Sequence, residues 1–191
     1  MYIRKTTIAD LPRLEEIFAY AREQMKKNGN PNQWGNHKPG RDMLIEDIEK
    51  QISYVLVENE HIYGTFVFFV GKDPTYDVIE DGAWLNDEPY GVIHRVASDG
   101  TKKGMMGQIA DFAKSQIANV RIDTHHDNHI MQRAVEKQGF KRCGIIYLED
   151  GDSRIAYHYA ASSKKDRKVY VVKKAGQETG ILNVLQEARN E

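Results

Sequence analysis

The chain has 191 residues, which is close to the usual length of one domain and long enough to bury a core without metals or disulfides. Hydrophobic residues make up 40% and charged residues 29%, as in ordinary globular proteins, and the formal net charge is only -1. This balance gives no global field that would attract nucleic acid or an anionic membrane surface, so we expect neither as a partner.

The apolar pattern predicts strands and helices that alternate along the chain. In order, the expected elements are a strand at 2–5, a helix at about 11–28, a loop at 29–40, a helix at 42–52, a hairpin of strands 54–57 and 62–70, a polar connection at 71–88, a strand at 90–97, a helix at 104–117, a strand at 120–123, a helix at 127–138 and strands at 140–148 and 154–159. This alternation indicates α/β architecture.

Residues 160–191 have a different composition, with a lysine-rich stretch followed by a candidate amphipathic helix at 181–188. We therefore divide the chain into one domain, residues 1–159, and a C-terminal extension of unknown role, residues 160–191.

Cysteine content and the amino terminus bear on the compartment. The single cysteine, Cys143, excludes an intramolecular disulfide and fits a reducing environment. Residues 1–10 are charged and lack the apolar run of a signal peptide, and no stretch approaches the roughly 20 apolar residues of a membrane span. We expect a cytoplasmic protein.

The most informative segment is residues 92–114, VIHRVASDGTKKGMMGQIADFAK, which predicts a strand, a glycine-bearing loop and a helix. A helix start leaves backbone N–H groups unpaired and positively polarised, and glycine lets a ligand approach the backbone closely. Gly100 and Gly104 provide that access, and Lys102 and Lys103 add positive charge. The segment matches neither the Walker loop nor the dinucleotide fingerprint. A phosphate-binding turn is predicted, while a plain strand–turn–helix connection is the alternative that this segment alone leaves open.

Residues 121–151, RIDTHHDNHIMQRAVEKQGFKRCGIIYLEDG, add a further strand, a helix opening near Asn128 and a Gly139-Phe140 ending. With these two segments, residues 2–159 resemble the GNAT superfamily of acetyltransferases. The resemblance implies a mixed, mostly antiparallel twisted sheet flanked by helices, in which the strand ending at Ala97 and the strand ending at Asp123 splay apart. It also implies an N-acetyltransferase that moves an acetyl group from acetyl-CoA to a small-molecule or peptide amine. A non-catalytic acyl-CoA sensor is the alternative, and a homodimer is left open.

The resemblance also implies where acetyl-CoA would bind. Backbone amides of the loop would hold its pyrophosphate, and Asn128 would reach its other arm. An amide near the end of the strand would stabilise the oxygen that gains negative charge during acyl transfer. The implied coenzyme contacts are Val96, Ala97, Ser98, Lys102, Lys103, Gly104, Met105, Met106, Gly107 and Asn128. The loop departs from the family pattern at Thr101 and Met106, and Met106 is expected to narrow the site.

Acid–base groups are less clearly marked. An ammonium must lose a proton before it can attack. His94 is the first candidate for the base that removes it, and His125 is the second. Each histidine has the alternative role of a packed or surface residue. Many family members carry a tyrosine that protonates the leaving thiolate, but Val135 occupies the matching position here. Tyr147 is the substitute acid, with a core role as its alternative.

Three further residue types complete the expectations. Trp34, in the loop between the first two helices, either covers the acceptor amine or anchors that loop to the core. Cys143 is expected to be a buried core residue, so that acetyl passes directly to the amine in a ternary complex.

His125 and His129 have the spacing of two metal ligands on one helical face, but Asp127 is interpreted as a helix cap and HExxH is absent. We expect no metal, with a metal site at this patch as the alternative.

Overall fold

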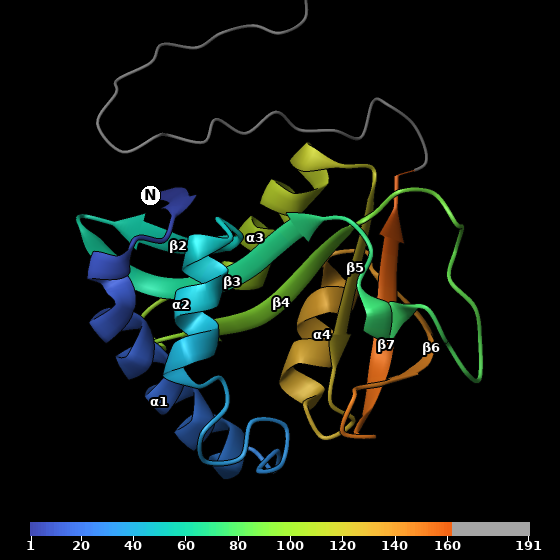
Figure 1. Cartoon of the computed structure of the whole chain (residues 1–191), viewed down its shortest axis with the longest axis horizontal. Coiled ribbons are helices and arrows are strands. Elements are labelled where there is room, and N and C mark those ends of the chain that lie inside the picture. The colour runs from blue at the N-terminus through green and yellow to red at the C-terminus, as the bar shows by residue number, and fades with distance from the viewer. Residues whose placement is uncertain (162–191) are drawn as a thin grey trace, which may run out of the picture.

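The computed structural model describes residues 1–161, so the candidate helix at 181–188 lies outside the described residues. Seven strands form one open sheet in the order β1-β2-β3-β4-β5-β7-β6 (Figure 1). The strands are β1 (Tyr2–Lys5), β2 (Ser53–Glu58), β3 (His61–Val70), β4 (Gly91–Ser98), β5 (Asn119–Thr124), β6 (Lys141–Tyr147) and β7 (Ser153–Ala160). Among them only β4 and β5 pair in parallel, which confirms the mixed, mostly antiparallel sheet.

Local sequence signals account for the first helix and hairpin. A short 3-10 helix, η1 (Ile8–Asp10), leads into α1 (Leu11–Lys27), which buries one stripe of apolar side chains and ends before Gly29, whose φ is 82°. In the β2–β3 hairpin, Asn59 and Glu60 both adopt positive φ, at 50° and 63°, as a two-residue turn requires. The predicted helix and hairpin are both confirmed.

The helix α2 (Arg41–Glu49) stops three residues earlier than the predicted end at 52. Gln51 has a φ of 56°, which turns the chain out of the helix and into β2. Ile52 therefore belongs to the turn, although its apolar side chain fits the helical pattern.

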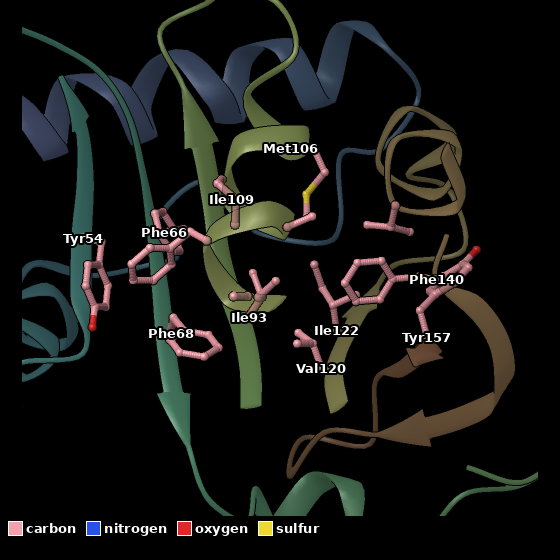
Figure 2. Close-up of a cluster of buried hydrophobic side chains, with 14 of the residues drawn as sticks. Tyr54, Phe66, Phe68, Ile93, Met106, Ile109, Val120, Ile122, Phe140 and Tyr157 are labelled. Atoms are coloured by element: carbon pink, nitrogen blue, oxygen red, sulfur yellow. The ribbon is translucent and has the colours of Figure 1, made fainter. Parts of the chain in front are cut away.

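One face of the sheet is covered by α3 (Met105–Gln116) and α4 (His129–Lys137). Figure 2 shows side chains from α3 and from β2 to β5 and β7 in one apolar cluster, with Met106 and Ile109 of α3 among them. Ile109 is completely buried in it.

The opposite face has two separate covers. The helices α1 and α2 pack on β2 and β3, with Phe18, Leu44 and Val55 in a second cluster. The connection from β3 to β4, residues 71–90, includes a 3-10 helix, η2 (Pro74–Tyr76), and covers the β5–β7–β6 half through Tyr76 and Tyr90. The centre of the sheet, over β4 and β5, lies between these covers. Within residues 1–161, no helix is long and apolar enough to cross a membrane.

Candidate active site between β4 and β5

The central strands separate halfway along their length. Pairing between β4 and β5 is confined to Gly91 with Val120, Val92 with Arg121 and Ile93 with Ile122. From His94 onward β4 runs free of β5, so its backbone groups on that side are not used by the neighbouring strand. The splayed central strands implied by the resemblance are confirmed.

A β-bulge reshapes β4 at this point. Opposite Phe66 alone on β3, β4 carries two residues, Arg95 and Val96, and Arg95 adopts a φ of 51°. Its guanidinium faces both carboxylate oxygens of Asp47 on α2, each at 2.7 Å. Burial raises the pKa of Asp47, although the charge of Arg95 opposes that rise. The ion pair fixes α2 against the bulge.

A cavity of about 790 Å³ lies over the separated strands. Its walls come from β4 and β5, from the α1–α2 loop and α2, and from the connection after β3. Polar groups lie at its floor and Trp34 and Met43 contribute apolar surface, a combination typical of small-molecule sites.

At the floor of the cavity, both ring nitrogens of His94 face carboxylates. Its Nε2 lies 2.6 Å from Oδ2 of Asp73, and its Nδ1 lies 3.4 Å from Oδ1 of Asp123. The same Asp123 oxygen accepts a hydrogen bond of 2.7 Å from the buried hydroxyl of Tyr76. Burial raises the pKa of Asp73, but hydrogen bonds from His94 and Thr75 outweigh it and lower that pKa to about 2. Asp73 is therefore ionised at neutral pH.

Sequence reasoning identified His94 but missed its two carboxylate partners. Asp73 belongs to the connection 71–90, which has no periodicity that would predict its position. Asp123 had a usable signal, because it ends a predicted strand at the point where the strands were expected to splay. Asp47 carries a charge of the kind usually found on an exposed helix face, but only 5% of it is exposed, because it pairs with Arg95 at the bulge.

The glycine loop lies at the end of β4, where α3 begins. Gly104 is the N-cap of α3 with a φ of 79°, and apart from its neighbours in the chain no atom of residues 1–161 lies within 4 Å of the position a Cβ would take. Within the described chain, the backbone amides from Lys102 to Met106 donate no hydrogen bond. The amide of Gly107 already donates to the Gly104 carbonyl at 3.1 Å. The free donors at this helix start are those an anion would use.

The start of the loop is held by Asp99. Its Oδ1 accepts hydrogen bonds from the amide and hydroxyl of Thr101, at 2.9 and 2.6 Å. Its Oδ2 faces Arg13 at 2.5 Å and His61 at 2.7 Å. These contacts fix the loop before any ligand binds.

Two side chains of the loop differ from expectation. Lys102 forms an ion pair with Glu58, so its charge is partly neutralised. Met106 is 8% exposed and belongs to the core beneath α3, so it does not narrow the loop. The helical register explains this, because α3 turns that position toward the sheet.

Among the implied coenzyme contacts on β4, Val96 lines the cavity, whereas Ala97 packs beneath α1 and α2 and Ser98 pairs with Gly64 of β3. Asn128 also lines the cavity. The cap of α4 was predicted to be Asp127, but it is Asn128, because the Oδ1 of Asn128 accepts a hydrogen bond from the amide of Met131.

Trp34 anchors its loop and also lines the cavity, while its contact with an acceptor amine stays a prediction. Its ring packs edge-on against Phe18 at 5.4 Å between centroids, which anchors the α1–α2 loop, and it also lines the cavity. The adjacent Gln33 accepts a hydrogen bond of 2.9 Å from Asn128, joining this loop to the start of α4.

Other candidates lie away from the cavity. Tyr147 is 46% exposed at the end of β6, and a hydrogen bond to Glu80 raises its pKa. Val135 is fully buried in the core. His125 is 3% exposed, does not line the cavity, and has its pKa lowered by burial. His94 is thus the one predicted acid–base residue that the structure places in the cavity.

The histidine patch differs from the predicted arrangement. His125 precedes α4 whereas His129 is its first residue, so the two do not share a helical face. Instead, His125, His126 and Asp127 bring three donor atoms within 4.8 Å of one another, the one such group in residues 1–161. The absence of a metal stays a prediction.

Comparison with solved structures places this architecture among acetyltransferases. A GNAT acetyltransferase from Streptococcus agalactiae is 26% identical, with a TM-score of 0.74 over 84% of this chain and 95% of that one. A GNAT acetyltransferase from Listeria monocytogenes is 17% identical, with a TM-score of 0.60 over 83% and 93% of the two chains. The aminoglycoside acetyltransferase AAC(6')-Ib, in complex with coenzyme A, is 16% identical, with a TM-score of 0.58 over 83% and 94%. No protein-family model and no curated protein matches the sequence.

The open sheet, its separated central strands and these structural relatives define an enzyme of the acyltransferase class. Within that class, the structure is similar to those of GNAT acetyltransferases.

Proposed function

We propose that the protein transfers the acetyl group of acetyl-CoA directly to an amine in a ternary complex. The observation that carries this proposal is the position of the cavity, which opens where β4 and β5 separate and has His94 beside Asp123 at its floor. Two solved structures of the aminoglycoside acetyltransferase AAC(6')-Ib, which has the same fold, contain coenzyme A, and one of them also contains kanamycin.

The loop after β4 fits a coenzyme pyrophosphate. The amides from Lys102 to Met106 have no acceptor within the described residues, and Gly104 leaves open space for close approach. Positive charge at the start of α3 favours an anion there. We assign the pyrophosphate of the coenzyme to these amides. We assign its pantetheine arm to the space between Val96 on β4 and the facing part of β5, with Asn128 at the edge of the cavity.

The cavity residues can remove the proton that the ammonium form of the acceptor must lose before it attacks. An incoming ammonium binds at the carboxylate of Asp123 and gives one proton to Nδ1 of His94, whose Nε2 faces Asp73. The bound coenzyme would supply a thioester carbonyl, at which a nitrogen–carbon bond would form while the carbon–sulfur bond breaks, and the new amide nitrogen would release its second proton to solvent. The proton then passes from His94 to solvent.

No side chain of the described chain is assigned as the acid for the leaving thiol. The described residues that line the cavity include no tyrosine, and Tyr147 lies outside it. A thiol with an ordinary pKa near ~8.5 leaves as a thiolate at modest cost, so an acid is dispensable.

Direct transfer is supported by the position of Cys143. It is the extra residue of a bulge in β6, 7% exposed, and it does not line the cavity. Burial raises the pKa of its thiol, so the nucleophilic thiolate is disfavoured. An acetyl-cysteine would also be a thioester like the one it replaces, and forming it would gain little.

The test measures the release of free thiol from acetyl-CoA in the presence of diamines, amino acids, peptides or aminoglycosides. A thermal-shift assay run in parallel measures how far coenzyme A stabilises the protein. We expect release that depends on the amine. Stabilisation without turnover of any amine would contradict the proposal and favour an acyl-CoA sensor.

A His94→Gln variant assigns the activity to this cavity. Turnover should fall by about 10²- to 10⁴-fold while coenzyme stabilisation persists, because a general base is lost and the coenzyme site is not. His129→Gln is the matched control, since His129 is exposed at the start of α4. Equal effects of the two substitutions would argue against His94 as the base.

A further inference from the structure

We infer that Asp73 is a positioning residue that fixes which nitrogen of His94 carries the proton. The catalytic consequence of this inference rests on the proposed function, whereas the proton position itself does not. Asp73 lies 21 residues before His94, in the irregular connection between β3 and β4.

Asp73 is held on three sides. Its backbone N–H donates to the Tyr90 hydroxyl at 3.2 Å. Its Oδ1 accepts from the amide of Thr75 at 2.9 Å and from the hydroxyl of Thr75 at 2.7 Å, which caps η2. These bonds leave Oδ2 for His94, at 2.6 Å from Nε2. The carboxylate therefore reaches the imidazole in a fixed orientation.

This orientation determines the tautomer. An ionised carboxylate can only accept hydrogen bonds, so Nε2 carries a hydrogen and the neutral ring keeps its lone pair on Nδ1. The rings of Phe69 and Tyr76 lie 6.2 and 5.8 Å from the His94 ring and limit its rotation. Nδ1 is left facing Asp123, where the proposed mechanism places the amine.

The competing acceptor for the ring proton is Asp123, whose Oδ1 lies 3.4 Å from Nδ1, whereas Oδ2 of Asp73 lies 2.6 Å from Nε2 and so forms the stronger hydrogen bond. Asp123 faces Nδ1 with the oxygen that accepts from the Tyr76 hydroxyl. Arg154 from β7 approaches the other Asp123 oxygen at 3.9 Å and is paired with Asp152 at 2.5 Å.

Asp73→Asn should reverse the tautomer. The two donors on Thr75 require an acceptor at the Oδ1 position, so the carbonyl oxygen of the asparagine remains there. The amide nitrogen then occupies the Oδ2 position and donates to Nε2, which moves the ring proton to Nδ1. A protonated Nδ1 cannot take a proton from the amine, so kcat should fall by about 10²- to 10⁴-fold, with little change in the KM for acetyl-CoA.

The readout is the ¹⁵N chemical shift of both ring nitrogens in histidine-labelled protein at alkaline pH, where imidazoles are neutral. The spectrum of His94→Gln identifies the His94 signals. We expect Nε2 protonated in the wild type and Nδ1 protonated in Asp73→Asn. Asp77→Asn is the matched control, with the same charge change at an exposed residue of the same connection, and it should leave the tautomer and kcat unchanged.

The outcomes separate this inference from the proposed function. Protonated Nδ1 in the wild type would overturn the inference without any variant, even if Asp73→Asn failed to fold. An unchanged tautomer in folded Asp73→Asn would also overturn it, whether or not the protein acetylates amines. The expected reversal in a protein that turns over no amine would support the inference and refute the proposed function.

Discussion

A charge placed at Gly104 tests the coenzyme site. Gly104 has a φ of 79° and open space where a Cβ would lie, so Asp and Asn, which tolerate left-handed backbone, fit equally well. Both residues also cap helices, and α3 should therefore survive either substitution. The two variants differ chiefly by one negative charge at the start of the helix.

The magnitude follows from Coulomb's law. A carboxylate about 5 Å from a phosphate charge costs about 0.8 kcal/mol at the dielectric constant of water and about 3 kcal/mol at an effective value of 20. We expect Gly104→Asp to weaken coenzyme A binding by at least about tenfold, or 1.4 kcal/mol, and Gly104→Asn to weaken it much less.

The assay is calorimetric titration with coenzyme A at low and high salt, with circular dichroism to confirm folding. Salt should narrow the difference between the two variants, because it screens exposed charges. Equal affinities for Asp and Asn, or an unchanged affinity for Asp, would refute the placement of the pyrophosphate at this loop.

Three further predictions concern Trp34, Cys143 and Asp73. Trp34→Ala should raise the KM for the amine more than the KM for acetyl-CoA, because Trp34 lines the cavity. Trp34→Phe is the control, and equal rises in the two KM values would indicate a folding role through the contact with Phe18. Cys143→Ala should keep near-normal turnover and intersecting double-reciprocal lines, whereas parallel lines with an acetylated protein would show an enzyme intermediate. The pKa of Asp73 is lowered to about 2 in the folded state, so its ionised form adds about 2 kcal/mol to the free energy of unfolding. This stabilisation is fully present above the unfolded pKa of about 4 and is lost as the pH falls toward 2. Acid titrations of unfolding should show this loss in the wild type and not in Asp73→Asn.

The sequence predicts the elements well where side-chain periodicity and turn chemistry agree. The apolar stripe of α1, the Asn59-Glu60 turn and the glycines around α3 each determine local structure through their own residues. The order of these elements then indicated the fold, and the resemblance supplied the separation of β4 from β5.

The catalytic surroundings depend on contacts that no local pattern contains. Asp73 is held by Thr75 and Tyr90 in an irregular connection, and its distance from His94 in sequence conceals their contact. The burial of Asp47 is not marked in the sequence, because the bulge that brings Arg95 to it arises from the register between two strands. Such positions follow from tertiary packing, which periodicity does not predict.

The most direct test of acetyl transfer at this site follows labelled acetyl groups through a single turnover. Enzyme, acetyl-CoA carrying a ¹³C-labelled acetyl group and an amine identified by the panel are mixed, quenched over time and analysed by mass spectrometry. The account predicts that label passes to the amine with no labelled protein at any time, and that His94→Gln slows its appearance. Label on the peptide containing Cys143 before it reaches the amine, or no transfer to any amine, would contradict it.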